Sequence, residues 1–240
     1  MIQQIIEWLT SSESWSGPGG IGTRLWEHIF YSGIVLIVTC AIAIPMGLYV
    51  GHSGRARWII TASNAARAVP TLGLLFAVTL WVGPRISSQL AFVIPSIVVL
   101  VLLAIPPVLS GAYAGVEAVD PAARDAAKGI GMRPLQVLGK VELPCALPLL
   151  MSGIRAATLQ VIATATVAAF VGLGGLGRFL IDGLATGNYV VTAGGALLVS
   201  VLALGIDGVL ALVERRIVSP GLTGKHPGNV GVVAEAGAPS

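Results

Sequence analysis

Residues 29–51 read IFYSGIVLIVTCAIAIPMGLYVG, a stretch of 23 residues without a single Asp, Glu, Lys, Arg or His. At 1.5 Å per residue, a helix of this length is about 35 Å long. The hydrocarbon core of a bilayer is about 30 Å thick, so this stretch is long enough to cross it with some tilt. It therefore predicts a membrane-spanning helix.

The composition of the whole chain agrees with this prediction. Of 240 residues, 55% are hydrophobic and 10% are charged, and the mean hydropathy is +0.88. A soluble domain carries about 25% charged residues, so the composition excludes an ordinary soluble enzyme. The net charge of +3 is too small to indicate a nucleic-acid partner. Membrane lipid is the expected surrounding.

The chain has four further apolar runs and predicts an all-α, polytopic membrane helical bundle. The expected spans are residues 29–51, 58–83, 90–112, 146–171 and 189–213. Pro70 is expected to bend the second span. Two alternatives concern residues 172–188. They could form a sixth crossing, or they could form a re-entrant turn that enters the membrane and leaves it on the same side.

The ends of the chain lie outside this 29–213 transmembrane domain. Residues 1–28 carry apolar side chains at helical spacing near the start, which indicates a helix in the membrane interface or an unordered terminus. No basic residue precedes Arg24, so a cleaved signal peptide is not expected. Residues 214–240 become rich in Gly, Ala and Pro and predict a disordered cytoplasmic tail.

The distribution of basic residues predicts the orientation. With the N-terminus outside and five crossings, the inner segments hold nine Lys and Arg residues, the outer segments hold three, and two lie within spans. Cytoplasmic segments of membrane proteins carry the excess of Lys and Arg. The bias places the C-terminus and the long segment 113–145 in the cytoplasm.

Residues 113–145 are charged and carry helix signals. Asp120 and Pro121 suit the N-cap and first position of a helix that is expected to run to about Lys128. Glycines then end it, and a second short helix is expected from Pro134 to a stop at Pro144. The two helices form either a knob for a soluble partner or an amphipathic loop that rests on its own bundle.

The spacing of residues in this segment resembles a known motif. Its elements are Asp125-Ala126-Ala127, then Gly131, then Val141, Leu143 and Pro144. This is similar to the EAA loop of bacterial ABC importer permeases, where EAA is followed after three residues by Gly and after nine more by Ile-x-Leu-Pro. Asp125 stands where Glu is usual and Val141 where Ile is usual. The resemblance implies that this loop docks onto a cytoplasmic ATPase subunit.

Other segments resemble one branch of that family, the glycine betaine/carnitine/choline permeases of osmoprotectant uptake. The similar stretches are residues 44–47, 68–72, 105–107, 116–121 and 168–177, whereas residues 109–111 depart from the branch's usual Arg-Asn-Thr. The resemblance implies a type I ABC importer permease fold in a bacterial cell membrane. It also implies three partners: ATPase subunits that use ATP and Mg, a second permease chain that is either identical or related, and a separate extracytoplasmic substrate-binding protein.

The glycine-rich segment matches G-x-G-x-x-G through Gly172, Gly174, Gly175 and Gly177. It follows an apolar span and lacks the strand-turn-helix setting that binds a dinucleotide. We expect flexible backbone in a gate region at the outer mouth, with a plain turn as the alternative.

No phosphate-binding loop is present, because neither Lys140 nor Lys225 is followed by Ser or Thr. No spacing of His, Cys, Asp and Glu residues indicates a metal site. We therefore expect no catalytic residue, no metal and no cofactor in this chain.

Three charged residues fall inside predicted spans, namely Arg67, Arg155 and Asp207. Such residues usually face the bundle or extend to the interface. One hypothesis is a structural role, and the other is an Arg155–Asp207 or Arg67–Asp207 pair that breaks and re-forms as the bundle changes conformation.

Three alternative functions remain open. The first is a permease for methionine or another amino acid in the same family. The second is an ATP-independent carrier or channel, which would be expected to show inverted repeats or several functional intramembrane charges. The third is a scaffold subunit that transports nothing.

Overall fold

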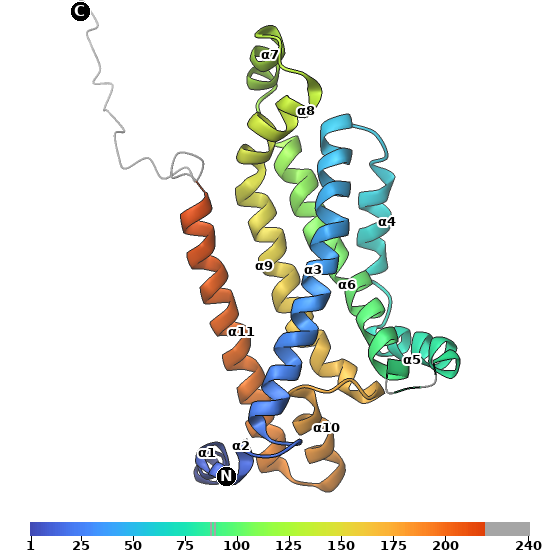
Figure 1. Ribbon diagram of the computed structural model, residues 1–240, viewed down its shortest axis with the longest axis vertical. Coiled ribbons are helices and arrows are strands. Elements are labelled where there is room, and N and C mark those ends of the chain that lie inside the picture. Colours follow the sequence, from blue (N-terminus) through green and yellow to red (C-terminus); the bar gives the residue numbers. More distant parts are fainter. Residues whose placement is uncertain (87, 89, 219–240) are drawn as a thin grey trace, which may run out of the picture.

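The computed structural model describes residues 1–86, 88 and 90–218, and within these residues it contains helices and no strand. Figure 1 shows an elongated bundle of long helices with short helices at both ends. In chain order the elements are α1 Ile2–Thr10, α2 Ser12–Trp15, α3 Ile21–Ser53, α4 Trp58–Ala66, α5 Thr71–Val82, η1 Gly83–Arg85, α6 Leu90–Glu117, α7 Pro121–Gly129, α8 Pro134–Val137, η2 Leu138–Glu142, α9 Leu143–Ala168, η3 Ala169–Val171, α10 Gly177–Thr186 and α11 Tyr189–Ile217.

Helix α6 is the centre of the bundle and packs between α3 and α9. In its most apolar stretch, 61% of the residues are buried within the chain, whereas the corresponding stretch of α11 has none. The main apolar cluster joins Val99 and Leu100 of α6 to Val35 of α3 and Ala165 of α9. The outer faces of α3, α5 and α11 carry exposed apolar side chains, as expected of helices in lipid.

Glycines let α6 and α9 approach very closely. A Cβ atom built on Gly153 would lie 2.6 Å from the carbonyl oxygen of Pro107 and 3.1 Å from the Cα of Gly111. A Cβ atom on Gly111 would lie 2.7 Å from the carbonyl oxygen of Leu149. Small residues at such crossings maximise backbone contact between helices in a membrane.

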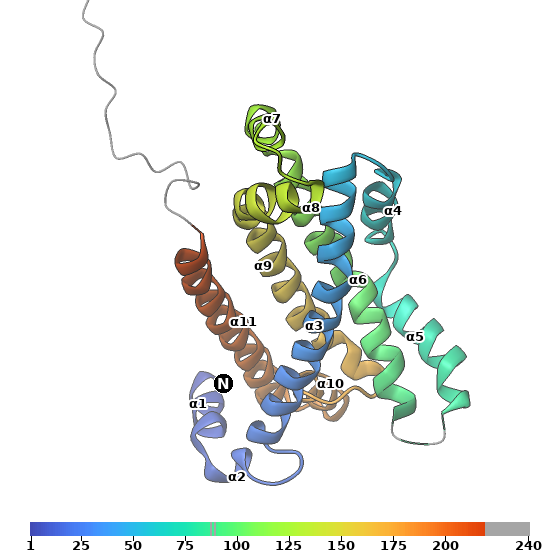
Figure 2. The same cartoon turned by 45° about the horizontal axis from the view of Figure 1, so that its top comes forward.

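The expected second span is broken. Helix α4 ends at Ala66, α5 begins at Thr71, and the two helices are bent by 92° at the break. Pro70 precedes α5 with φ −60° and ψ 118°, and its ring disfavours a helical conformation for Val69. The described residues therefore contain four helices long and apolar enough to cross a membrane, or five such spans if the broken pair counts as one. Figure 2 shows α5 turned away from the axis of α4.

The structure also moves other predicted boundaries. Helix α3 begins at Ile21, eight residues before the predicted span, and ends at Ser53, which is followed by Gly54 in the left-handed conformation. The predicted stop at Pro144 is wrong, because α8, η2 and α9 form one continuous helical path from Pro134 to Val171. The η2 segment is a π-helical turn, and Pro144 follows directly after it within the first turn of α9.

Two short helices close the end of the bundle opposite α7. Helix α10 has 10 residues, about 15 Å, so residues 172–188 do not form a sixth crossing. Helix α1 packs on α11, and Trp8 meets Phe179 of α10 edge to face at 5.3 Å. The N-terminal segment is therefore an ordered helix.

The α6–α9 contact predicts a difference between two Gly→Ala substitutions. Gly153→Ala is expected to cost about 1–3 kcal/mol, because its methyl group meets backbone that cannot yield. Gly33→Ala is the matched control, since nothing lies within 4 Å of its Cβ position and Ala is the better helix former. Thermal unfolding of the purified protein in detergent measures both. Equal midpoints would contradict the close contact.

Candidate functional site

Helix α7 lies at one end of the molecule, beyond the ends of the long helices (Figures 1 and 2). The side chain of Asp120 accepts a hydrogen bond of 2.8 Å from the N–H of Ala122 and caps the helix, as its N-cap position predicts. Asp125 and Ala126 are exposed, whereas Ala127 faces inward and is buried. The motif residues Asp125 and Ala126 thus form an accessible surface of small and acidic side chains.

A glycine turn fixes the direction in which the chain leaves α7. Gly131 has φ +84°, and its N–H donates to the carbonyl of Lys128 at 2.9 Å. This φ favours glycine because a Cβ atom would be strained there. Gly129, two residues earlier, has an ordinary φ. On either side of the turn, Ile130 and Leu135 are 77% and 79% exposed, so two large apolar side chains lie beside the α7 surface.

A buried carboxylate ties α7 to the bundle. Glu142 lies in the π-helical turn, is 2% exposed, and contacts His52 Nδ1 at 2.6 Å and Arg124 Nε at 3.0 Å. His52 belongs to the last turn of α3 and Arg124 to α7. A guanidinium nitrogen of Arg124 also donates to the carbonyl of Val116 at the end of α6. We call His52, Arg124 and Glu142 the Glu142 cluster.

The rest of the predicted motif lies beneath α7. Val141 and Leu143 are half-buried, and Pro144 is exposed at the start of α9. These residues belong to the continuous helical path that includes the π-helical turn and α9. The motif therefore combines the α7 surface with the connection from that surface into the bundle.

The sequence did not indicate the Glu142 cluster. Its acid lies 90 residues from its histidine and 18 from its arginine, and no spacing rule joins them. The only signal was an acidic residue between the apolar Val141 and Leu143.

At the opposite end of the bundle, the glycine-rich segment packs closely against α3 and α9. Gly172 and Gly175 have φ values of +96° and +87°. Glu27 of α3 accepts a hydrogen bond of 2.8 Å from the N–H of Gly175, and a Cβ atom on Gly174 would lie 2.4 Å from its carboxylate. A Cβ atom on Gly177 would lie 2.4 Å from the carbonyl of Thr166. The glycines permit left-handed turns and close approach to α3 and α9.

The structure pairs two of the three intramembrane charges. Arg155 contacts both carboxylate oxygens of Asp207 at 3.0 and 2.9 Å, and also contacts Glu214 at 3.0 Å. These contacts join α9 to α11. Arg67 is exposed at the end of α4 and takes no part in these contacts.

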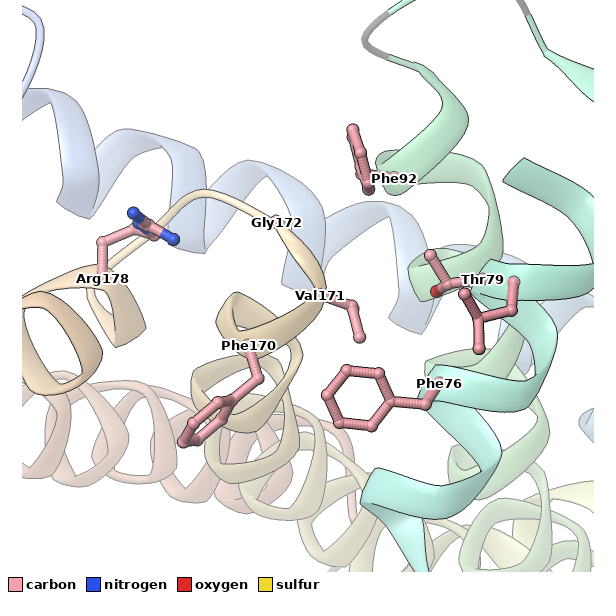
Figure 3. Close-up of a pocket in the computed structure, with 8 residues that line it drawn as sticks. Phe76, Thr79, Phe92, Phe170, Val171, Gly172 and Arg178 are labelled. Carbon is pink, nitrogen blue, oxygen red and sulfur yellow. The ribbon is translucent and has the colours of Figure 1, made fainter. Parts of the chain in front are cut away.

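A cavity of about 360 Å³ lies at the end of the bundle opposite α7 (Figure 3). We call it the aromatic cavity, because Phe76, Phe92 and Phe170 line it from α5, α6 and η3. Arg178 of α10 lines the same cavity. From the sequence these rings could either line a pore or pack within the spans, and their distance apart in the chain gives no sign that they meet. Among the described residues, no group of three or more His, Cys, Asp and Glu side chains is placed to hold a metal ion.

This fold and site define a class: a polytopic helical membrane protein with a short exposed helix at one end that is joined to the spans by buried ionic contacts. The model of the family described as binding-protein-dependent transport system inner membrane component matches residues 43–219. The chain belongs to this family. Its role is that of the membrane permease component of an ABC transporter, and this component is not itself catalytic.

Individual relatives are also permeases of transport systems. The choline transport system permease protein OpuBB of Bacillus subtilis is 36% identical over 202 residues, covering 83% of this chain and 89% of that protein. The carnitine transport permease protein OpuCD of Listeria monocytogenes is 31% identical and covers 90% of this chain and 92% of that protein. A solved chain of the MetNI methionine ABC transporter is 22% identical with a TM-score of 0.71. The match covers 81% of this chain and 94% of the solved chain, and it supports the same fold. The predicted type I importer permease fold is confirmed.

The Glu142 cluster predicts unequal effects of two Glu→Gln substitutions. Glu142→Gln removes a buried charge that faces two half-buried partners and is expected to destabilise the packing of α7 by about 3 kcal/mol. Glu117→Gln is the control: it breaks an exposed pair with Arg57 that is worth about 1 kcal/mol or less. Hydrogen exchange of the amides of residues 122–129 is expected to accelerate in the first variant alone. Equal exchange in both variants would show that Glu142 does not hold α7.

Proposed function

We propose that this chain is the permease of an ATP-driven importer of osmoprotectants of the quaternary-ammonium class, such as glycine betaine, choline and carnitine. The observation that carries the proposal is the match to permeases named for these compounds over 80–90% of the chain. The MetNI likeness is below 25% identity and supports the fold alone, so it does not favour a methionine substrate.

The proposed contact with the ATPase is the α7 surface. Asp125, Ala126 and the neighbouring Ile130 are exposed and combine small, charged and apolar side chains. Small side chains permit close approach, and exposed apolar residues suit burial in a protein cleft. Through the Glu142 cluster, a displacement of α7 acts on α3, α6 and the π-helical turn that leads into α9.

The proposed cycle follows from this connection. ATP closes the ATPase pair and carries α7 with it, the packed helices rotate from inward-facing to outward-facing, and a binding protein delivers the substrate at the opposite end. ATP and Mg belong to the ATPase subunits in this scheme. A second permease chain, identical or related, completes the pathway.

We further propose that the N-terminus is outside and that α7 and the C-terminal end of α11 are cytoplasmic. The nine-to-three excess of basic residues supports this orientation. The placement of α1 and the end of α11 at opposite ends of the bundle is consistent with it (Figure 1). The glycine-rich segment then lies at the outer mouth, where we propose that it forms part of the gate.

The first test is transport by the complete system of permease, ATPase and binding protein in proteoliposomes. We expect ATP-dependent uptake of labelled glycine betaine, choline or carnitine and none of methionine. Gly131→Ala strains the left-handed turn by about 1–2 kcal/mol and is expected to lower uptake and ATP hydrolysis together. Gly129→Ala is the control in the same loop, because its φ is ordinary and its Cβ position is open.

Uptake without ATP would contradict the proposal and support a carrier or channel. A Gly131→Ala variant with lower abundance but normal uptake per molecule would support a scaffold role. Contact with the ATPase is measured separately by cross-linking from Ala126→Cys after Cys40 and Cys145 have been replaced by Ser.

The Arg155–Asp207 pair supports a second proposal, that its contacts change as the bundle changes conformation. Asp207→Asn keeps the shape of the side chain and removes its charge, so it is expected to lower uptake several-fold while the complex still assembles. Glu214→Gln is the comparison, because Glu214 makes one contact to Arg155 where Asp207 makes two. Normal assembly with normal uptake in Asp207→Asn would exclude the switch.

A further inference from the structure

The aromatic cavity brings together two kinds of group. Phe76, Phe92 and Phe170 are each about half exposed, so their rings are accessible at its wall. Arg178 lines the same cavity from α10, and Figure 3 shows these four side chains around one space. Aromatic rings attract cations through their faces, and a guanidinium binds carboxylates. A ligand that satisfies both carries a positive and a negative group.

One residue in the wall of the cavity has a buried hydroxyl without a partner in the described part of the chain. Thr79 is only 9% exposed and lines the cavity, and its hydroxyl oxygen has no hydrogen-bond partner among the described residues. A buried hydroxyl without a partner is unfavourable in apolar surroundings. The oxygen itself is not exposed to the cavity, so a polar ligand satisfies it only when the side chain rotates toward the cavity, and a hydrocarbon chain never does.

Arg178 retains capacity for a ligand. One Nη donates to the carbonyl of Ala169 at 3.4 Å, and the other contacts Asp182 at 2.7 Å. A guanidinium carries five N–H groups, so three are not used by these two contacts. Those donors can bind a carboxylate while the contact with Asp182 keeps the side chain in place.

An adjoining cavity of about 460 Å³ extends the space on its polar side. It shares Phe92, Gly172 and Arg178 with the aromatic cavity and adds Arg24 and Glu27 of α3. The contact between Arg24 and Glu27 balances their charges, and Glu27 also holds the glycine-rich segment. The combined space is therefore aromatic on one side and ionic on the other, with Arg178 between them.

We propose that this space is a transient substrate site selective for zwitterions that carry a trimethylammonium group and a carboxylate. The ammonium group lies against the phenylalanine rings, and the carboxylate accepts hydrogen bonds from Arg178. A cation without a carboxylate is disfavoured, because Arg178 repels it and gains no partner. The inference rests on the proposed function and adds to it the class of substrate that the permease itself recognises.

The test is equilibrium binding to the permease–ATPase complex in lipid nanodiscs, with no binding protein added. Three probes separate the two charges. Glycine betaine has both, choline has only the cation, and tert-butylacetate has the same shape as glycine betaine with only the carboxylate. We expect saturable binding of glycine betaine that is at least about tenfold tighter than that of the other two.

Matched variants test each contact. Phe92→Leu is expected to weaken glycine betaine binding about three- to tenfold, whereas Phe30→Leu, equally exposed but outside the cavity, leaves it unchanged. Arg178→Gln is expected to weaken glycine betaine about tenfold and to bring its affinity close to that of choline. Arg178→Lys is expected to restore part of the preference for glycine betaine over choline. Asp182→Asn is expected to keep this preference, so the loss of the Arg178–Asp182 ion pair alone does not explain the effect of Arg178→Gln.

Three outcomes overturn the inference. The first is that choline binds as tightly as glycine betaine, and the second is that Phe92→Leu and Phe30→Leu have equal effects on binding. The third is that no probe binds saturably, as expected if lipid fills the cavity. Uptake by the complete system is measured in parallel. ATP-dependent uptake without binding at this cavity overturns this inference alone. Binding at the cavity without ATP-dependent uptake overturns the proposed function alone.

Discussion

The buried carboxylate of Glu142 is the constraint on which the position of α7 depends. Moving a carboxylate out of water costs several kcal/mol, and that cost is offset only when charged or polar partners surround the carboxylate. Here the partners come from two other elements, His52 at the end of α3 and Arg124 on α7. The charge can therefore be buried only when α3, α7 and the π-helical turn are assembled together. Helix α7, which buries little of its own surface, acquires a fixed position in this way.

The π-helical turn is part of the same arrangement. An ordinary helix through residues 138–142 would rotate every following side chain of α9 by about 100°, because each residue in an α-helix advances by that angle. The extra residue in the wider turn lets Glu142 face inward while Ala146 and Leu150 of α9 still face the core. The turn thus combines two helical registers, one for the ionic cluster and one for the bundle.

The sequence predicted the class of fold and most helices, because apolar length in a membrane depends on local composition alone. It also predicted α7 from its N-cap at Asp120 and its glycine end. Pro70 predicted a bend in the second span but not its size of 92°. Spacing could not predict the inward orientation of Glu142, because that orientation depends on contacts between distant segments. The same holds for the aromatic cavity, whose rings come from three elements that periodicity treats as separate lipid-facing surfaces.

The α6–α9 crossing connects the two ends mechanically. Gly111 and Gly153 bring the two backbones into direct contact, so neither helix can slide without moving the other. Helix α6 carries Phe92 in its first turn and ends at Glu117, beside the Val116 carbonyl that binds Arg124. Helix α9 begins at the π-helical turn and leads through η3 to Phe170. A rotation imposed on α7 would therefore be transmitted along two interlocked helices to both sides of the aromatic cavity. Such a rotation would change the distances between the rings, so under the proposed function a ligand bound between them would be released as the bundle changes conformation.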